Sequence, residues 1–256
     1  VDEVIEKTRA QIDKLKDLKT GMMQELLTKG IGPGGVPHTE FKDSPVGQIP
    51  VGWNVVLMDC ICKKITDGEH QTPKRSAYGY YLLSARNIRD GYIALDNVDF
   101  IDTSEYQRIS KRIEPQEGDI LISCSGSIGR TAIVPKKLKF SMVRSVAILQ
   151  PKRDLVDSQY LAHQISSPLI QTQIEKSLSQ LAQANLFQAP IKALNVVLPP
   201  MTEQLKIAQV VNSLVEVINE KTMNLNRTNS LKKALMQDLL TGKVRVNVEA
   251  RELAEA

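Results

Sequence analysis

The chain has 256 residues, of which 42% are hydrophobic and 24% are charged, and its formal net charge is +4. This composition excludes a wholly disordered chain and is sufficient for a hydrophobic core. No apolar run approaches the roughly 20 residues that cross a bilayer, and no signal peptide opens the chain, so we expect a cytoplasmic protein with no membrane contact. Cys60, Cys62 and Cys124 are an odd number of cysteines, which fits reduced thiols.

One sequence segment occurs twice, near opposite ends of the chain. Residues 18–29 and 231–242 are identical at seven of twelve positions without a gap. Repeats so far apart do not form a solenoid, in which neighbouring repeats stack. They predict two copies of one helix on either side of a different central domain. The identical pairs are Leu18/Leu231, Lys19/Lys232, Met23/Met236, Gln24/Gln237, Leu26/Leu239, Leu27/Leu240 and Thr28/Thr241.

The first predicted element is a helix over residues 1–30. Its apolar residues, among them Ile5 and Ile12, recur close to a three-and-four spacing, with charged residues between them. Gly30, Gly32 and Pro33 end the helix and begin a linker over residues 31–43.

Residues 44–200 predict a domain of mixed α/β structure. Short apolar runs are separated by turn signals such as Asp67-Gly68 and Asp90-Gly91, which is typical of strands. Two helices come next, and the second is expected to begin at Ser167-Pro168. Leu194 to Leu198 predicts a last strand, and Trp53 is expected to anchor the core.

Residues 201–242 predict one long helix, followed by a tail over residues 243–256. The helix has no internal glycine or proline before Leu240, and at 1.5 Å per residue it is roughly 55–60 Å long. A helix of this length must bury its apolar stripe, so we predict helix packing within a homodimer or with the other half of a larger parent. The expected packing residues are Ile5, Ile12, Ile207, Val211, Leu214, Ile218, Leu225, Leu235 and Leu239. The predicted fold class is α+β, with the mixed domain flanked by an N-terminal helix and a long C-terminal coiled-coil helix.

The motifs of several enzyme classes are missing. Neither glycine-rich phosphate-binding pattern occurs, and residues 123–129 do not form the Gly-x-Ser-x-Gly turn of the hydrolases. Leu198-Pro-Pro-Met201 lacks the polar and aromatic residues with which an adenine methyltransferase holds a flipped base. Cys60-x-Cys62 with His70 lacks a fourth zinc ligand. We therefore expect no catalysis, no metal and no cofactor on this chain.

A basic block indicates a surface for a polyanion. Residues 120–153 carry seven lysines and arginines and no acidic residue. Chance clustering on loops is the alternative, and charge alone does not decide between them. Arginine, asparagine, glutamine and lysine are the residues that read base edges or hold phosphates. The candidate nucleic-acid residues are His70, Gln71, Lys74, Arg75, Arg86, Asn87, Arg130, Lys136, Lys137, Lys139, Arg144, Gln183 and Asn185, with Gln188 beside them.

Five motifs in this order resemble the specificity subunit of type I restriction-modification systems. They are Ile49-Pro-Val-Gly-Trp53, Ile65-Thr-Asp-Gly-Glu-His70, Tyr81-Leu-Leu-Ser-Ala-Arg-Asn-Ile88, Gly118-Asp-Ile-Leu-Ile-Ser123 with Gly126-Ser-Ile-Gly-Arg130, and Leu198-Pro-Pro-Met-Thr-Glu-Gln204. The likeness covers nearly the whole chain. It implies a target-recognition domain over residues 44–200 between two spacer helices.

The resemblance also implies partners. A full subunit of that family has two recognition domains that read a bipartite site in double-stranded DNA, and it docks methyltransferase subunits and, through them, restriction subunits. S-adenosylmethionine is then expected on the methyltransferase. This chain has one recognition domain, so it resembles a half subunit or the second half of a longer one. The alternative function is a coiled-coil scaffold whose β-rich domain binds protein.

Overall fold

The computed structural model describes residues 1–179, 185–186 and 188–243. The chain forms two compact units: a helical unit, made of Val1–Gly21 and the described residues from Asn212 onward, and an α/β unit, Met22–Val211. Helix α1 (Asp2–Thr28) and the 40-residue helix α7 (Met201–Leu240) each contribute to both units. The predicted α+β fold class is confirmed. None of the described helices is long and apolar enough to cross a membrane.

The helical unit is an antiparallel pair formed within one chain. Ile5 and Ile12 of α1 and Ile218 of α7 are buried. Lys221 Nζ donates to Gln11 Oε1 at 3.0 Å, and Lys232 pairs with Asp2, so residue numbers rise along one helix as they fall along the other. Part of the predicted seam is therefore satisfied inside the single chain.

The described residues of the α/β unit form two four-stranded sheets and three two-stranded pairs. In the first sheet the strand order is β11-β10-β13-β4, and all neighbours are antiparallel; in the second the order is β12-β6-β9-β5. The first-sheet strands are β4 (Cys62–Asp67), β10 (Ile120–Ser123), β11 (Thr131–Ile133) and β13 (Val146–Pro151). Those of the second are β5 (Arg75–Ser76), β6 (Tyr80–Leu83), β9 (Asp99–Ile101) and β12 (Phe140–Met142). The pairs join β1 (Phe41–Lys42) to β2 (Ile49–Pro50), β3 (Asn54–Leu57) to β14 (Asn195–Leu198), and β7 (Ile88–Arg89) to β8 (Tyr92–Ile93).

Helices complete this unit. Besides the ends of α1 and α7 they are α2 (Met58–Ile61), α3 (Thr103–Ser110), α4 (Ser158–Ile165), α5 (Pro168–Ser179) and α6 (Gln188–Lys192), with short 3-10 turns at Pro33–Gly35 and Ala85–Asn87. The strand expected at Leu194–Leu198 and the helix expected at Ser167-Pro168 are confirmed as β14 and α5. Helix α3 was not expected. Its sequence signal is Asp102, whose side chain accepts from Glu105 N at 2.8 Å and caps the helix.

The core follows the continuous apolar runs. Every residue of β10 is buried, as are Val146–Leu149 of β13, which is the pattern of strands covered on both faces. Tyr80 stacks on Tyr106 of α3 with ring centroids 3.9 Å apart. Trp53 is fully buried, as expected.

Glu203, near the start of α7, fixes the segment that comes after α1. Its Oε2 accepts from Trp53 Nε1 at 2.9 Å, and its Oε1 accepts from Ile31 N at 2.8 Å and lies 2.9 Å from His38 Nε2. Gly30 has a φ of +70°, and a Cβ there would lie 2.4 Å from both Glu203 Oε1 and the Trp53 ring. The buried carboxylate of Glu203 thus attaches the segment after α1 to the start of α7.

Candidate nucleic-acid interface

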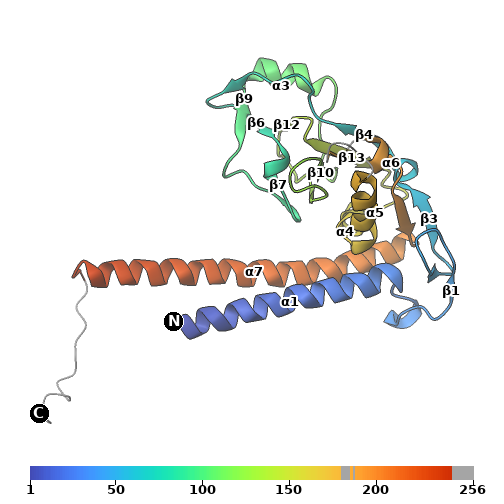
Figure 1. Ribbon diagram of the computed structural model, residues 1–256, viewed down its shortest axis with the longest axis horizontal. Coiled ribbons are helices and arrows are strands. Elements are labelled where there is room, and N and C mark those ends of the chain that lie inside the picture. The colour runs from blue at the N-terminus through green and yellow to red at the C-terminus, as the bar shows by residue number, and fades with distance from the viewer. Residues whose placement is uncertain (180–184, 187, 244–256) are drawn as a thin grey trace, which may run out of the picture. The chain divides into compact units, whose positions relative to one another are not determined.

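Four segments of the α/β unit meet at one end of the first sheet. Strand register places Asp67, the last residue of β4, opposite Ala147, and Ser123, the last of β10, opposite Val146. Leu186 N donates to Cys124 O at 2.9 Å, which brings the segment before α6 to the same place. We call residues 67–71, 123–130, 142–146, 185–186 and 188 the loop cluster. Figure 1 shows β4, β10, β13 and α6 grouped in this unit.

Backbone contacts hold the loop cluster together. Gly68 N donates to Val146 O at 2.9 Å, Glu69 N donates to Met142 O at 2.8 Å, and Arg144 N donates to Glu69 O at 3.0 Å. A Cβ on Gly68 would lie 2.3 Å from Met142 O, so the close approach of the two segments requires glycine. Arg144 and His70 therefore project from tightly joined backbone.

Asp67 of the loop cluster contacts three other side chains. Its Oδ2 lies 2.9 Å from His70 Nε2, and its Oδ1 accepts from Arg112 Nη2 at 3.1 Å and from Gln188 Nε2. Burial alone would raise the pKa of Asp67, but the hydrogen bonds from Gln188 and His70 outweigh it and hold the pKa below its usual range. The side chain is consequently an anion at neutral pH.

The structure places several predicted nucleic-acid residues in the loop cluster. His70, Gln71 and Arg144 are exposed there, and Asn185, Gln188 and Arg130 are partly exposed. Arg144 makes no ion pair with any described residue, whereas Arg130 lies 3.7 Å from Asp90. These residues come from four separate stretches of sequence.

The lysines of the basic block lie at the opposite end of the same sheet. Val134, just before them, bonds to Asp119 and Gly118, at the start of β10. Lys136, Lys137 and Lys139 are exposed on the loop after it. Because β10 runs from Ile120 to Ser123, these lysines are separated from Arg130 and Arg144 by the length of the strand. The basic block of residues 120–153 therefore does not form one compact patch, because β10 separates the exposed lysines from Arg130 and Arg144.

Other predicted residues are engaged elsewhere. Arg75 Nε and Arg86 Nη2 both lie 3.0 Å from carboxylate oxygens of Asp99 on β9. Lys74 is exposed, and its backbone N donates to Glu105. Gln183 lies outside the described residues.

Asn87 lies in the interior instead of reading a base edge. It is 1% exposed, its amide nitrogen donates to Ala94 O and Asn97 O, and its oxygen accepts from Ser84. A nucleic-acid contact by Asn87 would require this turn to open.

The hairpin of β7 and β8 adds residues that sequence reasoning missed. Gly91 N, at its tip, donates to Thr131 O at 2.8 Å, which sets the hairpin beside Arg130. Arg89 and Tyr92 are exposed and, with Arg130, line a hollow of about 300 Å³. The Asp90-Gly91 turn was visible in the sequence, but its position beside Arg130 was not.

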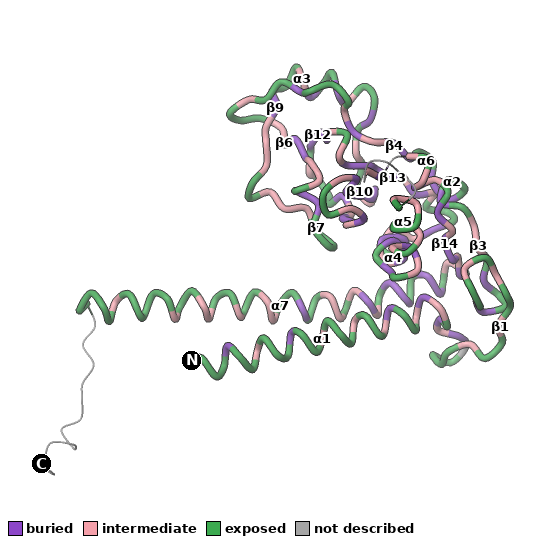
Figure 2. Tube along the Cα trace, in the orientation of Figure 1, coloured by how far each residue is buried: buried purple, intermediate pink, exposed green. Residues whose placement is uncertain are grey.

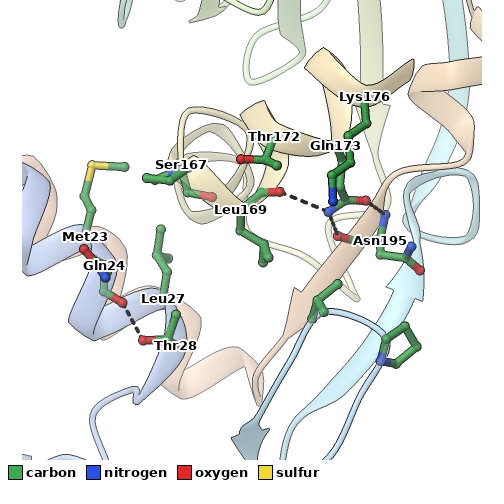
Figure 3. Close-up of a pocket in the computed structure, with 13 residues that line it drawn as sticks. Met23, Gln24, Leu27, Thr28, Ser167, Leu169, Thr172, Gln173, Lys176 and Asn195 are labelled. Carbon is green, nitrogen blue, oxygen red and sulfur yellow. Dashed lines mark hydrogen bonds between the residues drawn. The ribbon is translucent and has the colours of Figure 1, made fainter. Parts of the chain in front are cut away.

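The α/β unit also has a groove with many apolar side chains. Its volume is about 530 Å³, and it lies between the end of α1, the loop at Pro45 and Val46, and α5. Figure 3 shows Met23, Gln24, Leu27 and Thr28 on one wall and α5 residues on another. Gln173 of α5 bonds both the N and the O of Asn195, at 2.8 and 3.1 Å, and so joins the helix to β14.

The two buried cysteines are poorly suited to chemistry. Burial raises the pKa of the Cys62 and Cys124 thiols to about 12, which keeps both protonated at neutral pH. Within the described residues no three potential metal-ligating side chains come together.

Comparison with known proteins identifies relatives over most of the chain. Residues 50–231, more than half of the chain, match the family model described as the type I restriction modification DNA specificity domain. The chain is 27% identical over 261 residues to the MjaVIII type I restriction enzyme specificity subunit of Methanocaldococcus jannaschii, covering 96% of this chain and 58% of that protein. It is 27% identical over 256 residues to the EcoBI specificity subunit of Escherichia coli, covering 94% and 53%.

A solved structure shares the fold. The crystal structure of the type I restriction-modification system S subunit from M. genitalium superposes with a TM-score of 0.62 at 14% identity, over 93% of this chain and 57% of that one. The chain thus spans little more than half the length of the relatives it matches.

Proposed function

The chain belongs to the family of type I restriction modification DNA specificity domains, and from this membership we propose that it is a sequence-specific DNA-binding subunit of a restriction-modification complex. Its role is recognition, without catalysis of its own. The α/β unit reads one half of a bipartite site in double-stranded DNA.

The convergence of the loop cluster supports this proposal. Side chains able to read bases are gathered beside Arg130 and Arg144 at one end of the first sheet; they are His70, Asn185 and Gln188. Base edges give sequence discrimination, and cationic side chains hold phosphates. Among the described residues nothing comparable is assembled at the opposite end, where Lys136 and Lys137 stand on an exposed loop.

Two matched charge reversals test this assignment. Arg130→Glu with Arg144→Glu and Lys136→Glu with Lys137→Glu change the net charge equally, at opposite ends of the sheet. We expect the arginine pair to lower DNA affinity at least tenfold and to reduce the salt dependence by about two phosphate contacts, with a much smaller effect of the lysine pair.

The assay is a competitive titration with and without the methyltransferase subunit. If the affinity does not vary with DNA sequence even when that subunit is present, the proposed function is contradicted. If the lysine pair lowers DNA affinity more than the arginine pair, the DNA-binding surface lies at the other end of the sheet. Trp53 fluorescence reports whether each variant remains folded, because it is the only tryptophan of the chain.

We further propose that the end of α7 packs against a second recognition domain. Met23 and Leu27 of the repeat are 5% and 2% exposed in the α/β unit, whereas their counterparts Met236 and Leu240 on α7 are 51% and 85% exposed. A segment that buries these side chains at its first occurrence is expected to bury them at its second. The second domain belongs to an identical chain or to the other half of a larger subunit, and the helices then set the distance between two half-sites.

The predicted dimer seam needs revision on this point. Ile207, Val211 and Ile218 are buried within the single chain, so they are not free to receive a second one. Leu214 and Leu225 are partly buried, and Leu235 and Leu239 are exposed. The assembly surface is therefore expected over residues 231–241.

Light scattering tests the assembly surface. Met236→Glu with Leu240→Glu is expected to abolish association of the chain with itself or with the other half. Met223→Glu is the matched control, because Met223 is also exposed on α7 but lies outside the repeat. Equal association of both variants would contradict the proposal.

The remaining partners are inferred from the same family. We propose that methyltransferase subunits dock on this chain, bring restriction subunits with them, and carry S-adenosylmethionine. The purified chain is expected to transfer no methyl group to DNA until the methyltransferase subunit is added. Methyl transfer by the chain alone would contradict a purely recognising role.

The groove beside α5 favours a second candidate function, a scaffold whose α/β unit binds protein. Its apolar lining at Met23, Leu27, Val46 and Leu169 is suited to a protein partner. The arginine-pair variant separates the two functions. Because Arg130 and Arg144 do not line the groove, loss of DNA binding with assembly intact supports DNA recognition, and unchanged DNA binding would support the scaffold.

A further inference from the structure

An acidic side chain in the middle of the loop cluster requires an explanation. A carboxylate near phosphates repels them, so Asp67 acts against a DNA-binding surface if it has no other role. Its side chain is only 15% exposed and accepts hydrogen bonds from residues of three different segments. Burying a carboxylate costs solvation free energy, so its contacts with these three segments need a structural or functional role.

We propose that Asp67 is a positioning residue that holds His70 and Gln188 in the orientation in which they read DNA bases. The proposal rests on the proposed function of the α/β unit and names a residue on which its sequence discrimination depends. Asp67 itself does not contact the DNA.

The geometry of the carboxylate defines both partners. His70 lies three residues beyond the end of β4, and Gln188 is the first residue of α6. Nε2 of His70 lies 2.9 Å from Oδ2, and Nε2 of Gln188 donates to Oδ1. Because a carboxylate only accepts hydrogen bonds, each partner must turn an N–H toward it.

This arrangement determines which atoms remain for a base. With Nε2–H of His70 directed at Asp67, Nδ1 is the ring nitrogen that remains for a base. Gln188 retains its amide oxygen and its second N–H, the acceptor and donor pair that matches the edge of adenine. The two side chains are thereby ordered before DNA arrives, so less side-chain freedom is lost on binding.

Arg112 fixes the carboxylate from the other side. Its Nη2 bonds Asp67 Oδ1 and Thr66 Oγ1, each at 3.1 Å, and its Nη1 bonds Gly68 O at 2.6 Å. The guanidinium is thus hydrogen-bonded to the end of β4 and to the residue after it. Asp67 therefore has a fixed position from which to orient His70 and Gln188.

Glu69 offers a matched control in the same loop. It is also mostly buried, but its Oε1 accepts from the backbone N of Gln71, and its Oε2 lies 3.5 Å from Arg108. It bonds neither His70 nor Gln188. Glu69→Gln therefore removes one negative charge at nearly the same place as Asp67→Asn and leaves both reading side chains oriented.

A charge effect and a positioning effect of Asp67→Asn predict different changes in DNA binding. Loss of a negative charge alone strengthens binding to every duplex, as expected for Glu69→Gln. Loss of positioning lowers the discrimination between a preferred and a scrambled duplex by about tenfold, while affinity for the scrambled duplex stays the same or rises.

The experiment begins with a selection from a library of random-sequence duplexes, using the full chain together with the methyltransferase subunit. Affinities for the enriched duplex and for a scrambled one are then measured for the unsubstituted chain, Asp67→Asn and Glu69→Gln. We expect Asp67→Asn alone to lose discrimination, at the base positions that His70→Ala and Gln188→Ala also relax. Equal discrimination in Asp67→Asn and Glu69→Gln would overturn the inference.

A second measurement covers the case in which Asp67→Asn does not fold, as judged from Trp53 fluorescence. If one carboxylate orders both side chains, the effects of His70→Ala and Gln188→Ala on discrimination are expected to be coupled in a double-mutant cycle. Additive effects would overturn the inference. If the unsubstituted chain enriches no sequence at all, the proposed function is contradicted and the inference with it. This result differs from equal discrimination or additive effects, which contradict the inference alone.

Discussion

The two copies of the repeat share sequence and secondary structure but differ in surroundings. Both are helical, at the end of α1 and at the end of α7. Leu27 is 2% exposed and its counterpart Leu240 is 85% exposed. Figure 2 shows the last turns of α7 mostly as exposed, which agrees with these values.

The difference lies in the surroundings of the residues just after each helix. After α1 the chain turns at Gly30 into the pocket made by Glu203 and Trp53, whereas Gly242 after α7 has the same backbone conformation and open space around it. Helix propensity therefore accounts for both helices, while burial depends on contacts made by distant residues.

The largest effect is expected from removing the carboxylate that anchors the first copy. Glu203→Ala leaves Trp53 Nε1 and Ile31 N without their acceptor and His38 without its partner, so we expect a loss of roughly 3–5 kcal/mol, since each unsatisfied buried group costs about 1–3 kcal/mol. Urea denaturation followed by Trp53 fluorescence measures it.

The same variant tests the comparison directly. Amides of residues 23–28 are expected to exchange with solvent nearly as fast in Glu203→Ala as those of residues 236–241. Glu203→Gln keeps an acceptor for Trp53 and is the milder control. Unchanged protection of the first copy would show that Glu203 does not hold it.

Truncating the same leucine in each copy is the next test. Leu27→Ala removes a buried side chain and is expected to cost about 2–4 kcal/mol. Leu240→Ala removes an exposed one and is expected to stay within about 0.5 kcal/mol in the isolated chain. Equal losses of stability would contradict the difference in burial between the two copies. A large effect of Leu240→Ala that appears only on assembly would support packing of α7 against a second recognition domain.

The glycines after helices α1 and α7 give a smaller contrast. Gly30 and Gly242 have φ values of +70° and +69°, so alanine introduces similar backbone strain, about 1–2 kcal/mol, at both. Only at residue 30 does the new Cβ meet Glu203 and Trp53. Thermal unfolding of the two variants is expected to differ by a further 1–3 kcal/mol, roughly the cost of overpacking. Equal destabilisation would mean that the pocket relaxes around the added carbon.

The smallest expected effect concerns the ion pair of the helical unit. The hydrogen bond from Lys232 holds the pKa of Asp2 below its ordinary value of 3.8, so the ionised form is the one that folding favours. Its contribution is present above pH 3.8 and is lost as the pH falls through the lowered folded value. Asp2→Asn should therefore lower the melting temperature slightly at pH 7 and leave it unchanged near pH 2, measured by circular dichroism.

Asp17→Asn is the control for that variant. It removes the same charge from α1, and Asp17 makes no ion pair among the described residues. A pH-independent effect of Asp2→Asn, or an equal effect of both variants, would contradict a specific contribution from the Asp2–Lys232 pair.

Much of the fold could be predicted from local patterns. The continuous apolar runs at Ile120–Ile122 and Val146–Leu149 became buried strands, and the glycine-free stretch to Leu240 became one helix. Helix α3 was missed because it is short and its strongest signal is one capping aspartate, Asp102. Short elements carry too few residues for periodicity to separate them from turns.

The candidate site was predictable in composition but not in arrangement. His70, Arg144 and Gln188 were named as residues able to contact DNA, yet their convergence depends on the register between β4, β10 and β13 and on the contact between Leu186 and Cys124. The division of the basic block depends on the same register. Asn87 was named for its chemistry, and its burial in a turn became visible only with the structure.

By itself the sequence determined helices α1, α4, α5 and α7, several of the strands, the repeat and the family, because each is encoded in the order and spacing of neighbouring residues. Tertiary structure alone decided which copy of the repeat is buried, which cationic side chains share a surface, and that Asp67 joins His70 to Gln188. The physical reason is that these features depend on contacts between residues distant in the chain, whose register no local pattern specifies.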